Sequence, residues 1–140
     1  MTTKPETKFW KRIKNKFNKI TLTRIEAVTP LGLPDINAVF KIKNGKSGEF
    51  WIELKVTRGN SIGLTPNQIS WHFNHNKNGG ISFIMATPLG QRDISIYSGA
   101  RALDLAKSGL SLDPCALFLD PCDFQELESW LLRRVNELRN

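Results

Sequence analysis

Apolar residues recur with helical spacing near the start of this chain and alternate with polar residues further on. Lysines and arginines lie between the apolar positions of the first stretch. This pattern predicts an amphipathic helix with one apolar and one strongly basic face. Thr3 is a candidate cap for this helix, and Glu6 would complete a capping box. Its apolar positions are Phe9, Trp10, Ile13, Phe17 and Ile20.

Five later segments carry the alternation, or the β-branched and aromatic content, that is typical of strands. An Asn44-Gly45 pair separates the second segment from the third and indicates a hairpin. The predicted strands are Ile20–Val28, Asp35–Ile42, Glu49–Thr57, Ile81–Ala86 and Asp93–Tyr97.

Helices are predicted after the third strand and again near the C-terminus. Thr65 can cap a helix that has Pro66 at its first position and runs to about Lys77. A shorter helix is expected over Ala100–Lys107, and Asp123 can cap a last one. The order αβββαββ, followed by helices, indicates a mixed α/β domain with a C-terminal helical addition.

Composition narrows the range of partners. A chain of 140 residues has room for one domain with a real core. Its net charge of +7 favours an anionic partner, either nucleic acid or an acidic membrane surface. The chain shows no signal-peptide pattern and no stretch apolar enough to span a bilayer. Cys115 and Cys122 fit reduced thiols, so we expect an intracellular protein, in the cytoplasm or nucleoid, or phage-encoded and acting in a host cell.

Two carboxylates and a lysine form the candidate chemical group. Glu53 and Lys55 are two residues apart, so they point to one face of the third strand. Taken alone, they could be a solvent-facing pair. If the second and third strands form a hairpin, however, Asp35 lies around Lys55 and Thr57, within one pleat of Glu53. Carboxylates that close repel unless a cation lies between them. Asp35, Glu53 and the Leu54 carbonyl are plausible oxygen ligands for Mg²⁺.

These residues, in this order, resemble the PD-(D/E)xK nuclease superfamily, in particular archaeal-type Holliday-junction resolvases and VRR-NUC nucleases. The resemblance covers roughly Glu6 to Ala86, and four pieces match in order. They are Glu6 on the first helix, G-L-P-D-I at Gly32–Ile36, W-I-E-L-K at Trp51–Lys55, and L-T-P-N-Q at Leu64–Gln68.

The resemblance implies a restriction-endonuclease-like core over residues 1–97, with residues 98–140 as a helical extension packed on the same domain. It implies a Mg²⁺-dependent DNA endonuclease in which Mn²⁺ can substitute. Asp35 and Glu53 would hold the metal, and Lys55 would orient the attacking water and steady the developing charge. Glu6 would complete the acidic cluster, and Gln68 would position Lys55 or a phosphate.

The implied partner is DNA, branched or duplex, and a family-like homodimer could cut two strands of a junction symmetrically. Glu26 is the rival of Glu6 for the acidic role. His72 and His75 lack a third metal ligand and are interpreted as packing or phosphate-contact residues. The candidate DNA contacts are Lys8, Lys11, Arg12, Lys43, Lys46 and Arg58.

Three alternatives remain open. The same fold serves sequence-specific endonucleases of the homing or restriction type, and the region after Tyr97 could be a specificity element. A non-catalytic nucleic-acid-binding domain would have no need for crowded carboxylates. A basic membrane-surface protein would carry a Lys/Arg-rich helix with a deep apolar face and no acidic cluster.

Overall fold

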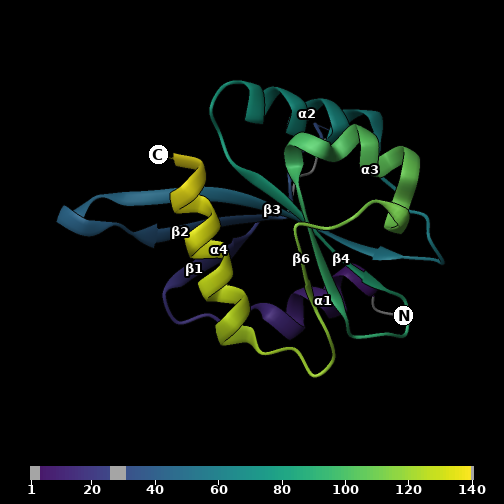
Figure 1. Ribbon diagram of the computed structural model, residues 1–140, viewed down its shortest axis with the longest axis horizontal. Coiled ribbons are helices and arrows are strands. Elements are labelled where there is room, and N and C mark those ends of the chain that lie inside the picture. The colour runs from purple at the N-terminus through teal and green to yellow at the C-terminus, as the bar shows by residue number, and fades with distance from the viewer. Residues whose placement is uncertain (1–3, 26–30, 140) are drawn as a thin grey trace.

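The computed structural model describes residues 4–25 and 31–139. Within them the chain forms four α-helices and six strands (Figure 1). The helices are α1 (Pro5–Ile13), α2 (Pro66–Lys77), α3 (Ala102–Ser108) and α4 (Phe124–Arg139). The strands are β1 (Ile20–Arg24), β2 (Ile36–Lys41), β3 (Ser47–Thr57), β4 (Ser82–Pro88), β5 (Ile94–Ser98) and β6 (Ala116–Phe118).

The strands form one open mixed sheet in the order β1-β2-β3-β4-β5-β6. Among the described strands only the β3–β4 pair is parallel, because α2 carries the chain back across the sheet between these two strands. The other neighbours run antiparallel. The predicted mixed α/β fold is confirmed at this level. The C-terminal region is not purely helical as expected, since β6 adds a sixth strand beside β5.

The two faces of the sheet pack against different helices. Phe50, Ile52 and Leu54 on β3 lie in the larger core, which also contains apolar residues of α1 and α4. The opposite face carries a smaller core in which Ile84 and Ala86 of β4 pack with α3 residues. Figure 1 shows α2 and α3 together, away from α1 and α4. Glu53 and Lys55 alternate with the β3 core residues and therefore point to the α2 side.

The predicted first helix is too long. α1 ends at Ile13, and the Lys16 amide donates to the Ile13 carbonyl oxygen in the turn that follows. Phe17 lies beyond the helix but still packs on the larger core, whereas Ile20 begins β1. The helix N-cap is Lys4, which makes no side-chain capping bond. Thr3, the expected cap, lies outside the described residues.

The capped starts predicted for α2 and α4 are confirmed, whereas α3 begins at Ala102, two residues after the expected Ala100, because Gly99–Arg101 forms a 3-10 turn. Thr65 and Gln68 form a reciprocal capping box at the start of α2. Asp123 accepts hydrogen bonds from the amides of Gln125 and Glu126 at the start of α4. Each predicted strand is found with its ends shifted by up to two residues, except the first, whose C-terminal part includes residues that are not described. Within the described residues, no helix combines the length and apolar character needed to cross a bilayer.

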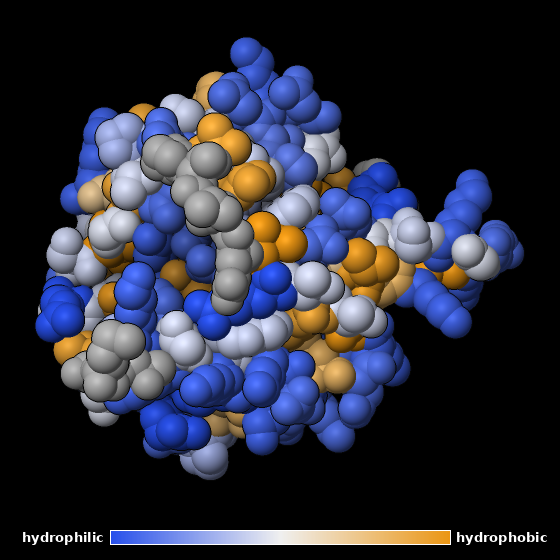
Figure 2. Space-filling model, turned by 180° about the vertical axis from the view of Figure 1, so that it is seen from behind, coloured by the Kyte–Doolittle hydropathy of each residue, from blue (hydrophilic) through white to orange (hydrophobic). Residues whose placement is uncertain are grey.

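Strands β2 and β3 continue past the rest of the sheet as a hairpin arm, defined here as Lys41–Gly48. Figure 1 shows the arm projecting from the body, and Figure 2 shows from behind that its tip is largely hydrophilic. Asn44 and Gly45 turn the chain with φ of 76° and 74°, as an Asn-Gly hairpin signal predicts. The Ile42 amide closes the turn by donating to the Lys46 carbonyl oxygen at 2.7 Å.

Candidate active site

Asp35 and Glu53 lie together at the start of β2. Ile36 pairs with Ile52, so the antiparallel register places Asp35 opposite Glu53. Asp35 Oδ2 accepts a hydrogen bond from the Leu54 amide at 2.8 Å. The expectation that Asp35 lies around Lys55 and Thr57 is therefore wrong by about two residues. Asp35 and Glu53 are closer than the expected separation of one pleat, because they lie directly opposite each other on one face of the sheet.

Gly32 fixes the approach of the Asp35 segment to α2. Its φ of +80° favours glycine. A Cβ at this position would overlap the backbone oxygen of Asn67. The G-L-P-D turn is thus pressed against the first turn of α2, and this close approach brings Asp35 and Gln68 to the same end of the sheet.

Lys55 is held by three groups on the α2 side. Its Nζ donates to Gly63 O and to Gln68 Oε1, both at 3.0 Å, and lies 3.9 Å from Glu53 Oε2. Gln68 Oε1 also accepts from the Thr65 amide at 3.0 Å, so the capping box of α2 orients the acceptor that positions Lys55. The predicted link between Gln68 and Lys55 is confirmed. Gly63 was not identified from the sequence, because a carbonyl partner leaves no side-chain signal.

Glu53 is 2% exposed and carries the strongest electrostatic perturbation in this group. Burial raises the pKa of Glu53 well above its usual range, and the charge of Asp35 and a hydrogen bond with Asp35 raise it further. Lys55 lowers this pKa, but by less. In the absence of a cation, the protonated form of Glu53 is therefore favoured at neutral pH.

The donor set fits a hard cation. Glu53 Oε1 is buried and has no hydrogen-bond partner, although buried polar atoms normally find one. Within the described residues, no three His, Cys, Asp or Glu side chains gather as a candidate metal site. Protein ligands would thus be Asp35, Glu53 and the Leu54 carbonyl, with water completing the shell, which is how Mg²⁺ is usually bound.

Glu6 lies on the first turn of α1 and is half-buried. Its charge contributes to the raised pKa of Glu53, so the two carboxyl groups are within electrostatic reach of each other. No contact between them is observed in the described residues, and a catalytic role for Glu6 stays a prediction. Glu26, the rival acid, lies outside the described residues.

The candidate DNA contacts are spread over three regions. Lys8 and Lys11 are exposed on α1, on the sheet face opposite Lys55. Arg12 is half-buried and donates to the Arg92 carbonyl oxygen at 3.0 Å, so its guanidinium is partly engaged within the protein. Arg58 is exposed directly after β3, in a turn where its backbone pairs with Ser61, and Lys43 and Lys46 are exposed on the hairpin arm.

The two histidines of α2 have packing roles. His72 is fully buried, with Nδ1 2.7 Å from Ser82 Oγ, and Asn76 Nδ2 donates to the same hydroxyl at 2.8 Å. His75 stacks on Trp71 with ring centroids 4.4 Å apart. These contacts agree with the packing part of the interpretation, and a phosphate contact by either histidine stays a prediction. The partners of His72 were missed because a serine at a strand start and a helical asparagine give no distinctive spacing.

The chain matches no model of a known protein family, and no curated protein matches it. The geometry of the described side chains therefore carries the functional argument.

Proposed function

We propose that this protein is a Mg²⁺-dependent DNA endonuclease with a PD-(D/E)xK active site, selective for branched DNA in the manner of a Holliday-junction resolvase. The observation that carries the proposal is the meeting of Asp35, Glu53 and Lys55 on one sheet face, with Gln68 holding the lysine. The order α1, β1–β3, α2, β4, β5 is the order expected of a restriction-endonuclease-like core. This order supports the proposal independently of the side chains.

Each residue has a role that follows from its surroundings. Mg²⁺ when bound would act as a Lewis acid on the phosphodiester and favour deprotonation of the attacking water. Asp35 and Glu53 supply the anionic ligands, and the buried, unpartnered Glu53 Oε1 is the atom most in need of a cation. Lys55 has a fixed position because Gly63 and Gln68 hold it, so its ammonium can bind the water or the phosphate oxygen without reorganising.

The basic charge of the chain supports DNA as the substrate, with the exposed lysines of the hairpin arm as phosphate contacts. Two copies in a symmetric dimer would present two such sites to a branched junction.

The test is cleavage of a panel of labelled DNAs with Mg²⁺ or Mn²⁺, set against EDTA. The panel contains a four-way junction, a flap, a splayed arm, single strands and long duplex DNA. Asp35→Asn, Glu53→Gln and Lys55→Ala should each abolish cutting while DNA binding and thermal unfolding stay close to those of the wild type. Glu49→Gln is the matched control, because Glu49 is exposed on the same face of β3, two pleats away.

Paired symmetric cuts in the junction would support a resolvase-like enzyme. Discrete cuts in long duplex DNA, with junctions spared, would favour a sequence-specific endonuclease instead. Unchanged cutting by all three site variants would refute the assignment of the active site. DNA binding without any metal-dependent cutting would leave a non-catalytic binding domain as the better interpretation.

A further inference from the structure

The positive charge of this protein is confined to one part of the chain. Residues 1–58 contain 13 Lys and Arg against 5 Asp and Glu, a net charge of +8. Residues 59–140 contain 7 against 8, a net charge of −1. The first part includes α1, β1 and the β2–β3 hairpin. An anionic partner is therefore attracted mainly to the surfaces formed by these elements.

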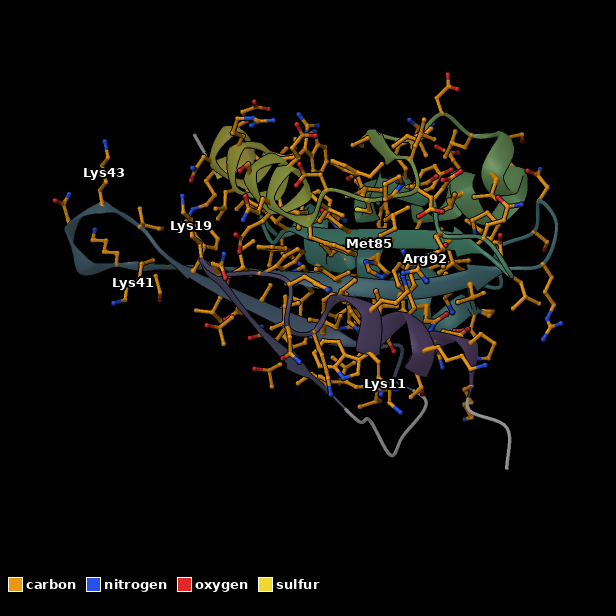
Figure 3. All side chains as sticks on the ribbon, turned by 90° about the horizontal axis from the view of Figure 1, so that it is seen from below. Lys11, Lys19, Lys41, Lys43, Met85 and Arg92 are labelled. Atoms are coloured by element: carbon orange, nitrogen blue, oxygen red, sulfur yellow. The ribbon has the colours of Figure 1, made fainter. Side chains whose placement is uncertain are left out.

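The hairpin arm concentrates part of this charge on a fixed support. Lys41, Lys43 and Lys46 are all exposed on it, and Figure 3 shows Lys41 and Lys43 on the projecting end with Lys19 near its base. The base is anchored at Gly48, where an added Cβ would overlap the Phe40 ring and crowd the Arg139 guanidinium. The lysines are thus carried by a paired β-ribbon whose base is closely packed against Phe40 and Arg139.

A groove lies at the base of the arm, where it meets the start of β1 and α4. Its volume is about 760 Å³, and its apolar floor includes Val39, Phe40 and Leu132. Lys19, Lys41 and Lys46 line it, and its described lining includes no acidic side chain. A concave surface with three ammonium groups is complementary to a row of phosphates.

The groove is connected to the active site by an open stretch of sheet. Strand pairing places Thr21, Thr23, Asn37 and Val39 on the same face as Asp35, and Lys41 follows on this face. The two threonines are exposed, and Asn37 and Val39 are half-exposed, so none of the described helices fully covers this face of β1 and β2. On β1 and β2 this surface consists of short hydroxyl, amide and apolar side chains between an anion-binding end and the carboxylate end. Its one described acidic neighbour on β3 between the two ends is the exposed Glu49, which pairs with Val39.

We propose that duplex DNA lies along this open face, with the hairpin arm and its groove binding the phosphate backbone at a distance from the cutting site. This inference rests on the proposed function and adds the path of the substrate. Lys46 and Glu53 are seven residues apart on one strand ladder, which spans about 23 Å at 3.3 Å per residue. At 3.4 Å per base pair along each DNA strand, the arm would contact phosphates about seven base pairs from the cut.

The experiment compares two variants in the Glu53→Gln background with EDTA, so that binding is measured without cutting. The arm variant carries Lys41→Gln, Lys43→Gln and Lys46→Gln. The control loses the same charge through Lys77→Gln, Lys107→Gln and Arg133→Gln, which are exposed on α2, α3 and α4. Binding of a labelled 30-base-pair duplex is measured across a salt series, and hydroxyl-radical footprinting maps the protected phosphates.

The arm variant should bind about 100-fold more weakly at 0.1 M salt, and the slope of log K against log salt should fall by about 2.7, at 0.9 for each phosphate that is no longer neutralised. The control should change the slope by less than about 0.9. The footprint should lose protection about seven base pairs from the cut that the wild type makes with Mn²⁺. The single change Lys43→Glu at the tip should weaken binding in the same direction, and thermal unfolding checks that each variant is folded.

Equal slopes for the arm and control variants would overturn the inference, and the proposed nuclease would still stand if the wild type cuts. An arm variant that binds DNA as the wild type does, but no longer binds phosphatidylserine vesicles, would also overturn it, in favour of a membrane surface. A protein that binds duplex DNA through the arm but never cuts it would support the binding path and refute the proposed function.

Discussion

Without a divalent cation, the stability of this protein should fall as pH rises above neutrality, and Glu53 should cause most of the loss. Burial, first, and then the neighbouring Asp35 raise the pKa of Glu53 in the folded state. The native state therefore holds a proton that the unfolded state, with a pKa of about 4.3, has released. Stability from this source is fully present below the unfolded pKa and is lost as pH rises toward the folded pKa.

The size of the effect follows from one proton. A difference of one bound proton changes the free energy of unfolding by about 1.4 kcal/mol per pH unit. Glu53 is 2% exposed, so solvent screens it little, although the nearby Lys55 reduces the shift. Between pH 6.5 and pH 8 the upper limit is about 2 kcal/mol, or roughly 6 °C in Tm for a domain of this size.

The assay is urea unfolding in EDTA at pH 6.5, 7.2 and 8 for the wild type, Glu53→Gln and Glu49→Gln. The wild type and Glu49→Gln should lose stability with pH, and Glu53→Gln should be flat by comparison. Added Mg²⁺ should stabilise the wild type more at pH 8 than at pH 6.5, because binding requires the deprotonated carboxylate and releases a proton. The same pH slope in the wild type and Glu53→Gln would refute the reasoning, whatever Mg²⁺ does.

Three further predictions concern the support of the site. Gly32→Ala should cost about 3 kcal/mol in urea unfolding, because its methyl group would overlap a backbone oxygen, whereas Gly90→Ala, also at positive φ but in open space, should cost about 1 kcal/mol. Gln68→Ala should lower the cutting rate and cost about 1 kcal/mol through the lost cap, and Gln68→Glu should restore the rate, because it keeps an acceptor for Lys55. Burial lowers the pKa of His72 to about 4, so stability should be lost as pH falls from 6.5 toward 4. Thermal unfolding of His72→Gln should show a smaller loss of stability over the same pH range.

The elements that the sequence predicts well are those with a strong local signal. The capped start of α2 depends on Thr65, Pro66 and Gln68, which are adjacent in the chain, and it is confirmed. The pairing of Asp35 with Glu53 follows from alternation and the Asn-Gly turn. The register that the sequence predicts for this pair is wrong by about two residues. β3 begins at Ser47, so its ladder with β2 extends into a stretch whose polar composition indicates a turn.

The elements that the sequence does not predict depend on distant partners. β6 is three residues long, and its pairing with β5 is decided by an available sheet edge and not by local alternation. α1 ends at Ile13 although Phe17 continues the helical spacing, because Phe17 reaches the same core from the turn. Gly63 as an acceptor for Lys55 and Ser82 as a partner of His72 also arise only when the chain is folded.

Buried polar atoms without hydrogen-bond partners show where this fold loses stability. Among the described residues, such atoms are Arg12 Nε, Glu53 Oε1, Thr57 Oγ1 and His72 Nε2. Glu53 and Thr57 point to the α2 side of β3, and His72 lies on α2, so three of the four atoms belong to the layer that contains Lys55. Arg12 lies on α1, in the opposite layer. Each buried, unpaired polar group costs about 1–3 kcal/mol, which packing of apolar residues would avoid. The opposite layer, against α1 and α4, is built mainly from aliphatic and aromatic side chains and contains one such atom, so most of this cost lies where the proposed chemistry needs a cation and a fixed lysine.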